Sequence, residues 1–268
     1  MRALSEKTVD TPRAARHRQG QSWLLPSAPN PRAGVRLFCF PYAGGAAHIY
    51  RSWQASLPSV VEVCPVQLPG HGQRILEPAF DHLTPLVEAA AEALLPYCDK
   101  PFAFFGHSMG ALISFELSRL FRRKHDLKPI HLFVSGHRAP QLKDKLERIH
   151  DLPDDKFILK LRELEGTPAQ VLEQPELMQL LMPILRADFG LCETYEYVEE
   201  PPLDSPITAF GGTEDETGEP QLEGWREQTS AEFSLQMFPG GHFFIHTAQR
   251  PLLHAVADRF VRTLGAAA

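Results

Sequence analysis

The chain has 268 residues, of which 43% are hydrophobic and 22% charged, a balance typical of one globular domain of the larger α/β kind without coiled-coil or disorder bias. A formal net charge of −6 argues against nonspecific binding of nucleic acid. The sequence has no apolar run that predicts a membrane span.

The cysteines are scattered along the chain, without a C-x-x-C pair or the spacing of metal ligands. Most of them stand in apolar surroundings, so we expect buried free thiols and no metal site. Free thiols are typical of a reducing compartment, and we expect a cytoplasmic protein. The four residues are Cys39, Cys64, Cys98 and Cys192.

The first twenty residues are basic and lack the apolar run of a secretory signal. An organelle transit sequence is an alternative, but Glu6 and Asp10 argue against it. We therefore expect a disordered leader over residues 1–30 and a single α/β domain over residues 31–268.

The first predicted strand, Val35 to Phe40, runs directly into a loop of small residues from Pro41 to Ala47. Such a loop lets a backbone N–H group approach a bound ligand closely. A plain tight turn before a helix around residues 48–57 explains the same residues, and the loop alone does not decide between the two.

The second predicted strand, Val60 to Val66, ends in a stretch rich in glycine and proline that contains His71. This stretch is expected on the ligand side of a parallel sheet, where His71 either faces a substrate or is a loop residue without a chemical role. Asp81 is predicted to cap the next helix, because a short carboxylate can accept from exposed amides. The predicted buried face of that helix is Leu83, Leu86, Val87, Ala90 and Leu94.

The central motif is G-x-S-x-G, from Gly106 to Gly110. An apolar run precedes it and a helical pattern from Met109 to Arg123 follows it, so Ser108 is predicted at a strand-to-helix turn. The sharp bend at such a turn explains the glycine on each side of the serine. The motif indicates an exposed nucleophilic hydroxyl, which needs a base, an acid that orients the base, and amide donors for an oxyanion.

In hydrolases with this turn, one amide donor is the residue after the nucleophile and the other lies in the loop after an early strand. We therefore assign the two donors to the backbone amides of Met109 and Ala43. The other partners are expected in the chain order serine, acid, histidine.

Basic residues follow the helix after Ser108. They either complement the helix dipole or form a docking patch for an acidic partner. The next strand, Ile130 to Ser135, is followed by no carboxylate, so the acid is not expected there. The basic residues are Arg119, Arg122, Arg123, Lys124, His125 and Lys128.

The alternation of strand and helix stops between about residues 141 and 198. Helical patterns cover Asp154 to Leu164, Pro175 to Leu185 and Arg186 to Tyr197, with a break at Pro183. The segment is too long for an ordinary connection and predicts a helical lid insertion over the sheet edge. Its apolar side chains either line an acyl channel or only pack the insertion onto the body.

Three carboxylates follow the strand predicted at 206–211, and spacing alone does not choose among them. We prefer Asp215 over Glu214 and Glu216, because its short side chain can be fixed rigidly on a turn.

The last clear strand, Phe233 to Phe238, leads directly to His242, which we predict as the base. His246 is a rival, but it falls within the next helical segment. His107 is expected to pack in the turn beside the nucleophile.

Together, five ordered motifs resemble the type II thioesterases that accompany nonribosomal peptide and polyketide synthases. The resemblance spans about residues 35 to 265. The motifs are Phe40 to Gly45, Gln67 to Gly70 with Arg74 and Glu77-Pro78, Gly106 to Gly110, Leu185 to Phe189 with Glu193 and Tyr195, and Gly240 to Phe244.

The resemblance implies an α/β-hydrolase fold with a mostly parallel sheet, a lid, and a triad of Ser108, Asp215 and His242. It also implies hydrolysis of acyl thioesters from the phosphopantetheine arm of acyl or peptidyl carrier proteins. No metal or bound cofactor is expected, because that arm belongs to the substrate, and we expect a monomer. The family commonly has a charged residue after Pro-Gly, whereas this chain has His71-Gly72.

Three alternatives remain open from the sequence. Medium-chain fatty acyl thioesterases share most of the motifs. A serine esterase acting on oxygen esters would use the same triad, and a noncatalytic carrier-binding module could retain the fold with a decayed site.

Overall fold

The computed structural model describes residues 22–25, 30–143, 147–164 and 166–265. Most of the predicted leader lies outside these residues. Residues 22–25, however, are ordered against the body: the Trp23 carbonyl accepts from the Gln67 amide at 2.7 Å, and the Leu25 amide donates to the Pro65 carbonyl at 3.1 Å. The prediction of a disordered leader is therefore wrong for this short stretch.

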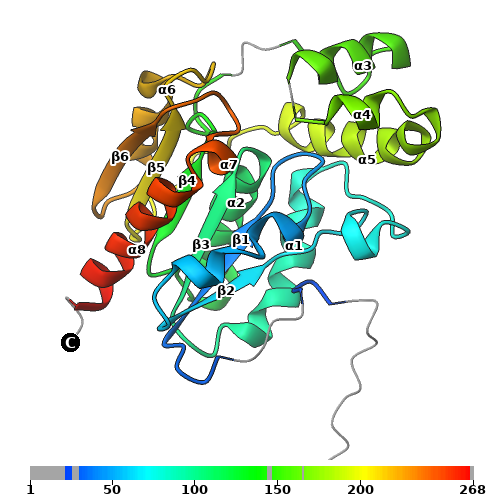
Figure 1. Cartoon of the computed structure of the whole chain (residues 1–268). Coiled ribbons are helices and arrows are strands. Elements are labelled where there is room, and N and C mark those ends of the chain that lie inside the picture. The colour runs from blue at the N-terminus through cyan, green and yellow to red at the C-terminus, as the bar shows by residue number, and fades with distance from the viewer. Residues whose placement is uncertain (1–21, 26–29, 144–146, 165, 266–268) are drawn as a thin grey trace, which may run out of the picture.

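The centre of the molecule is a six-stranded sheet in the order β2-β1-β3-β4-β5-β6, with all five neighbouring pairs parallel (Figure 1). The predicted α/β-hydrolase type of sheet is confirmed. The strands are β1 (Val35–Phe40), β2 (Val61–Pro65), β3 (Phe102–His107), β4 (Leu132–Ser135), β5 (Ile207–Gly212) and β6 (Phe233–Phe238).

The register aligns the carboxyl ends of the strands. Phe40 pairs with Gly106, His107 with Ser135, and Gly212 with Phe238. Because the strands are parallel, the loops that follow β1, β3, β5 and β6 all leave from the same edge of the sheet.

Two buried clusters cover the two faces of the sheet. In β1, Phe38 and Phe40 face one cluster, whereas Leu37 and Cys39 face the other, as the alternation of side chains along a strand requires. The first cluster includes α1 (Leu83–Leu94) and α2 (Met109–His125). The second includes α8 (Gln249–Gly265) and two short 3₁₀ helices, η1 (Ala47–Tyr50) and η2 (Trp53–Ser56), which replace the single helix predicted there.

The buried face predicted for α1 is confirmed at all of its positions. The prediction that Asp81 caps this helix is wrong. The N-cap residue is His82, no side chain caps the helix, and the Asp81 carboxylate instead accepts from Nδ1 of His82 at 2.8 Å.

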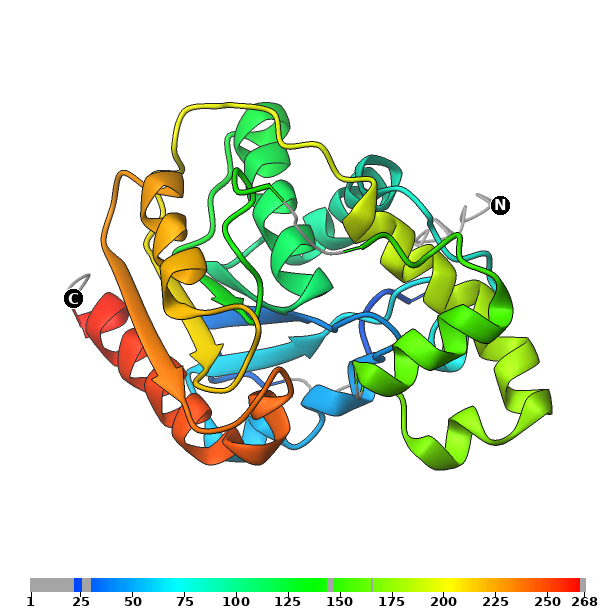
Figure 2. The same ribbon diagram turned by 90° about the horizontal axis from the view of Figure 1, so that it is seen from above.

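A helical insertion lies between β4 and β5 and contains α3 (Asp154–Glu163), α4 (Ala169–Leu172) and α5 (Pro175–Glu193). Figure 2 shows these helices side by side, on the opposite side of the molecule from α8. The break predicted at Pro183 is wrong, because Pro183 lies inside α5. Burial of Ile184, Leu185 and Leu191 stabilises this helix through its tertiary contacts, which override the local preference of proline.

The remaining short elements are 3₁₀ helices and single helical turns in the connections. They are η3 (Gly72–Arg74), η4 (Leu95–Tyr97), α6 (Glu219–Glu223), η5 (Gly224–Gln228) and α7 (Phe244–Thr247).

The basic residues around the end of α2 form ion pairs within the chain. Arg122 and Arg123 both pair with Glu200, and Lys128 pairs with Asp204. These contacts favour a structural role for the charges over a docking patch.

Cys39 and Cys64 are buried, whereas Cys98 and Cys192 are partly exposed. Burial raises the pKa of Cys64 to about 12 and that of Cys98 to about 11. Among the described helices, none combines the length and hydropathy needed to cross a bilayer.

Candidate active site

Ser108 stands at the turn between β3 and α2, as predicted. Its backbone has φ 53° and ψ −119°, a strained conformation for a residue other than glycine. Its amide donates to the Ser135 carbonyl at 2.7 Å, and its carbonyl accepts from the Ala111 amide at 2.9 Å. The turn is therefore held at both its peptide groups, and the serine is presented at the end of a central strand.

The glycines beside Ser108 allow two close backbone approaches. A Cβ atom at Gly106 would lie 1.9 Å from the carbonyl oxygen of Gly110. A Cβ atom at Gly110 would lie 2.2 Å from the carbonyl oxygen of Phe40. The second approach places the start of α2 against the end of β1, beside the loop that follows β1.

That loop is a tight turn, in which the Gly45 amide donates to the Tyr42 carbonyl at 2.8 Å and Gly44 has φ 73°. Within the described residues, neither the Ala43 amide nor the Met109 amide has a hydrogen-bond acceptor. The two predicted donors are therefore free to bind a ligand, and the two interpretations of the loop are compatible.

The structure brings Asp215 and His242 together. Nδ1 of His242 lies 2.9 Å from Oδ2 of Asp215, and Oδ1 of Asp215 accepts from the Thr217 amide at 3.1 Å. The Asp215 side chain is 4% exposed, and that of His242 is 32% exposed. Glu214 and Glu216 are exposed on the same loop. With Nδ1 directed at the carboxylate, Nε2 of His242 remains to accept a proton.

The other two histidines near the site are engaged elsewhere. His107 is fully buried, with Nδ1 2.9 Å from the Ser135 hydroxyl, and its ring centroid lies 5.2 Å from that of His242. Burial holds the pKa of His107 well below its usual value, with a smaller effect from His242. His246 has Nε2 2.9 Å from the Tyr42 hydroxyl. His107 is therefore a neutral packing residue, as predicted.

The insertion contacts this site at two places. A Cβ atom at Gly44 would lie 2.6 Å from Cδ2 of Leu185, and one at Gly166 would lie 3.0 Å from Cζ of Phe243. Leu185 belongs to α5, and Phe243 directly follows His242. The insertion therefore touches both the loop after β1 and the loop that carries His242.

Sequence reasoning missed a buried pair, Asp188 and His71, which joins the insertion to the site. Nε2 of His71 lies 2.8 Å from Oδ2 of Asp188, and the same oxygen accepts from the Gly44 amide at 2.7 Å. The structure therefore places His71 in a buried pair with Asp188, a contact that neither interpretation of this loop predicted. The available signals were a carboxylate within an apolar stretch of α5 and the unusual residue after Pro69-Gly70.

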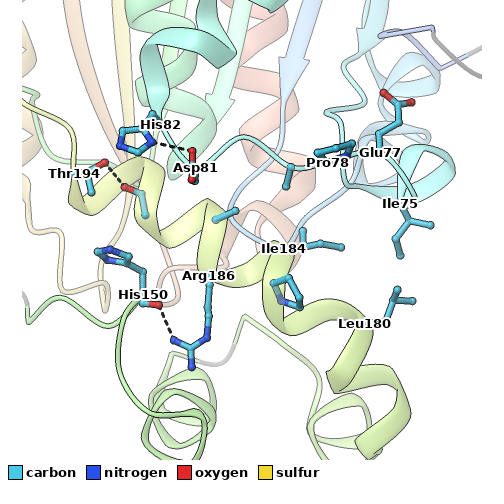
Figure 3. A pocket seen from close by; sticks show the side chains of 14 residues that line it. Ile75, Glu77, Pro78, Asp81, His82, His150, Leu180, Ile184, Arg186 and Thr194 are labelled. Carbon is cyan, nitrogen blue, oxygen red and sulfur yellow. Dashed lines mark hydrogen bonds and ion pairs between the residues drawn. The ribbon is translucent and has the colours of Figure 1, made fainter.

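A separate cavity of about 580 Å³ lies between α5 and residues 75–82 (Figure 3). Leu180 and Ile184 line it, and Arg186 beside it donates to the His150 carbonyl. Its lining does not include the predicted triad. Another set of insertion side chains packs internally, so the insertion has both packed and cavity-facing apolar residues. The packed residues include Ile149, Phe157, Leu161, Leu172, Met178 and Leu185.

Comparison with known families accounts for this arrangement. A family model described as the thioesterase domain matches residues 35–264. The chain belongs to the thioesterase family. It is therefore a hydrolase that acts on thioesters. Both the sequence motif and the structure place Ser108 at a turn between a strand and a helix.

Several relatives match most of the chain. "Linear gramicidin dehydrogenase LgrE" of Brevibacillus parabrevis is 49% identical, over 88% of this chain and 92% of the relative. "Thioesterase PikA5" of Streptomyces venezuelae is 35% identical, over 91% and 87%. The rat medium-chain S-acyl fatty acid synthase thioesterase is 33% identical, over 81% and 83%. Although LgrE is named a dehydrogenase, the present sequence has no G-x-G-x-x-G motif of dinucleotide-binding domains.

The solved structure of the type II thioesterase BorB from the borrelidin biosynthetic cluster has a TM-score of 0.81 to this thioesterase. It is 32% identical and covers 90% of this chain and 99% of its own. The similarity therefore includes the insertion region as well as the sheet.

Proposed function

We propose that this thioesterase is a type II enzyme that removes acyl groups from the phosphopantetheine arm of carrier proteins in nonribosomal peptide or polyketide synthesis. The observation that carries the proposal is the Asp215–His242 pair, which lies at the same sheet edge as Ser108. Its support is the near full-length similarity to LgrE and BorB, whose names refer to gramicidin and borrelidin.

In the proposed mechanism, Nε2 of His242 takes the proton of Ser108 as Oγ attacks the acyl carbonyl carbon. Asp215 holds the imidazole through Nδ1 and stabilises its positive charge. The amides of Ala43 and Met109 donate to the developing oxyanion; removing one such donor typically lowers the rate by about 10²- to 10³-fold.

The tetrahedral adduct then collapses, and the thiol leaves with the proton held by His242. Water attacks the acyl-enzyme in the second half-reaction, with His242 again as the base, and releases the carboxylic acid and free Ser108. We propose that no metal or bound cofactor takes part, and that the insertion acts as a lid that limits access of bulk water. A monomeric state and a cytoplasmic location remain predictions from the sequence.

The medium-chain fatty acyl thioesterase is the second candidate function, because the rat enzyme also matches most of the chain. The higher identity to LgrE, 49% against 33%, favours the synthase-associated role. An esterase acting on oxygen esters would use the same groups. A noncatalytic module is disfavoured, because the Asp215–His242 pair lies at the sheet edge of Ser108 and the Ala43 and Met109 amides have no acceptor within the described residues.

Mass spectrometry of acyl-loaded carrier domains tests the proposal. Wild-type enzyme and Ser52→Ala, a change at an exposed serine, should unload the carriers, whereas Ser108→Ala should not. Equal unloading by Ser108→Ala and wild type would contradict the mechanism. Faster cleavage of a p-nitrophenyl ester than of the acyl-pantetheine with the same chain would favour the esterase instead.

A further inference from the structure

A single carboxylate oxygen joins the insertion to two loops of the body. Asp188 lies on α5, and its side chain is 1% exposed. Its Oδ2 atom accepts from the Gly44 amide at 2.7 Å and lies 2.8 Å from Nε2 of His71. Gly44 is in the loop after β1 and His71 is in the loop after β2, so this contact depends on the insertion being seated on the body.

His71 is the charge partner of Asp188. Its Nδ1 atom lies 2.9 Å from the Pro69 carbonyl oxygen, which can only accept, so Nδ1 carries a proton. The Asp188 oxygen that accepts from the Gly44 amide also lies 2.8 Å from Nε2 of His71, so a proton on Nε2 can donate to it. Burial alone would lower the pKa of His71, but the charge and hydrogen bond of Asp188 raise it.

The contact lies one peptide group from the predicted oxyanion donor. The N–H group that Asp188 accepts belongs to the peptide between Ala43 and Gly44. Because a peptide group is planar, fixing this one restricts rotation at Ala43, whose own amide belongs to the preceding peptide. Leu185 packs on Gly44 from the same helix, so both contacts of α5 restrain this position.

We infer that Asp188 is a positioning residue for thioester hydrolysis, which holds the peptide after Ala43 so that the Ala43 amide points at the oxyanion. His71 balances the buried charge. The inference rests on the proposed function, because it takes Ala43 as a donor. Under this inference, the oxyanion site is complete only while the insertion helix α5 contacts the loop after β1.

Three variants separate positioning from simple support of the fold. Asp188→Asn keeps an acceptor oxygen for the Gly44 amide and removes the charge. Asp188→Ala removes both and leaves His71 unpaired. The double variant His71→Leu with Asp188→Leu removes the acceptor without leaving a buried charge, and apolar replacement of a buried ion pair is often neutral for stability.

The matched control is Glu193→Gln. Glu193 is also on α5, and it accepts from the Ile149 amide at 3.0 Å and lies 2.5 Å from Nδ1 of His150. These contacts lie within the insertion and its entry, away from the loop after β1. The control therefore changes a carboxylate of the same helix without changing the restraint on Gly44.

The first measurement is kcat and KM on a short acyl-pantetheine thioester, with the active fraction titrated by a fluorophosphonate. We expect kcat to fall by about 10- to 100-fold in Asp188→Ala and in the double variant, as for a misplaced oxyanion donor, with little change in KM. Asp188→Asn should retain kcat within about fivefold and Glu193→Gln within about twofold of wild type, because each keeps the Gly44 acceptor.

The second measurement is the affinity for an acyl trifluoromethyl ketone, whose adduct with Ser108 places an oxyanion at the site. Its Ki should rise by the same factor as kcat/KM falls, because both report binding of the oxyanion. A role in folding alone would lower the active fraction and leave Ki unchanged. The inference is overturned if the folded double variant keeps kcat and Ki within twofold of wild type, or if Asp188→Asn falls as far as the double variant.

The same experiment separates this inference from the proposed function. If the wild type reacts with the fluorophosphonate but does not cleave the thioester, the proposed function fails and the ketone comparison still decides the role of Asp188. If the wild type neither reacts with the fluorophosphonate nor binds the ketone, both fail.

Discussion

Nδ1 of His242 lies 2.9 Å from Oδ2 of Asp215, although the two residues are 27 positions apart in the chain. They meet because Gly212, at the end of β5, pairs with Phe238, at the end of the neighbouring parallel strand β6. Each residue needs only a short loop to reach the other. The pairing therefore depends on the register of two strands rather than on a long excursion of either loop.

Replacement of Asp215 by Asn should lower kcat by about 10⁴-fold, the loss that the corresponding change causes in serine proteases, because the amide favours the wrong tautomer of the histidine. Glu214→Gln, on the same loop but exposed, should stay within twofold of wild type. Steady-state kinetics on an acyl-pantetheine substrate measures both. Comparable losses in the two variants would remove Asp215 from its assigned role.

Gly106→Ala should lower the free energy of unfolding by about 3 kcal/mol or more, because overpacking against rigid backbone is costly. The added Cβ atom would lie 1.9 Å from the Gly110 carbonyl oxygen. Gly218→Ala is the matched control, since its Cβ atom would lie 3.7 Å from the nearest atom. Urea unfolding followed by circular dichroism should place the control within about 1 kcal/mol of wild type; similar losses in both variants would refute the steric argument.

The ion pairs at the end of α2 predict that carrier unloading tolerates changes there. Arg123→Ala and Lys128→Ala each remove a cation that pairs with Glu200 or Asp204. Exposed pairs of this kind contribute about 0–1 kcal/mol to stability, so both variants should fold. We expect kcat/KM with an acyl carrier protein within twofold of wild type. A tenfold rise in KM for the carrier alone, with a free acyl-pantetheine unaffected, would instead identify a docking patch.

The buried pair of His71 and Asp188 predicts how stability depends on pH. The folded state raises the pKa of His71 above its ordinary value of 6.5. This contribution to stability is therefore complete below about pH 6.5 and is lost as the pH rises through the folded-state pKa. Urea unfolding of the wild type between pH 6 and 9 should show this loss, and the double Leu variant should show less of it.

Other histidines act in a different pH range. Burial lowers the pKa of His131 to about 3 and lowers that of His107 well below its usual value. Their contributions are lost as the pH falls below about 6.5, because the unfolded state then binds more protons. An unfolding free energy that rises between pH 7 and 9 in the wild type, but not in the double variant, would contradict the assignment for His71.

The sequence was sufficient for the features that are encoded locally. Short apolar runs indicate the strands, and chemical groups directly follow the carboxyl ends of those runs. Each of the candidates Ser108, Asp215 and His242 is therefore predicted from one strand and the loop after it. The parallel order of the sheet then brings the ends of those strands to one edge.

Contacts between distant segments left no comparable signal. His71 and Asp188 are 117 positions apart, and neither residue has a local pattern that requires the other. Pro183 indicated a helix break by its local preference, but packing of α5 overrides that preference. Asp81 is a residue type that often caps helices, but His82 takes the N-cap position. The Asp81 carboxylate accepts a hydrogen bond from the His82 ring instead.

The contact between Asp188 and Gly44 limits how specificity can be exchanged among such enzymes. A chimera that takes the insertion helices from one parent and the sheet with its loops from another would inherit residues 188 and 71 from different parents. Grafting the insertion helices alone would leave the Asp188 carboxylate buried against a loop that lacks its histidine partner. Successful recombination therefore requires a crossover scheme that inherits the two positions together, even though hundreds of ångströms of chain contour separate them in the linear sequence.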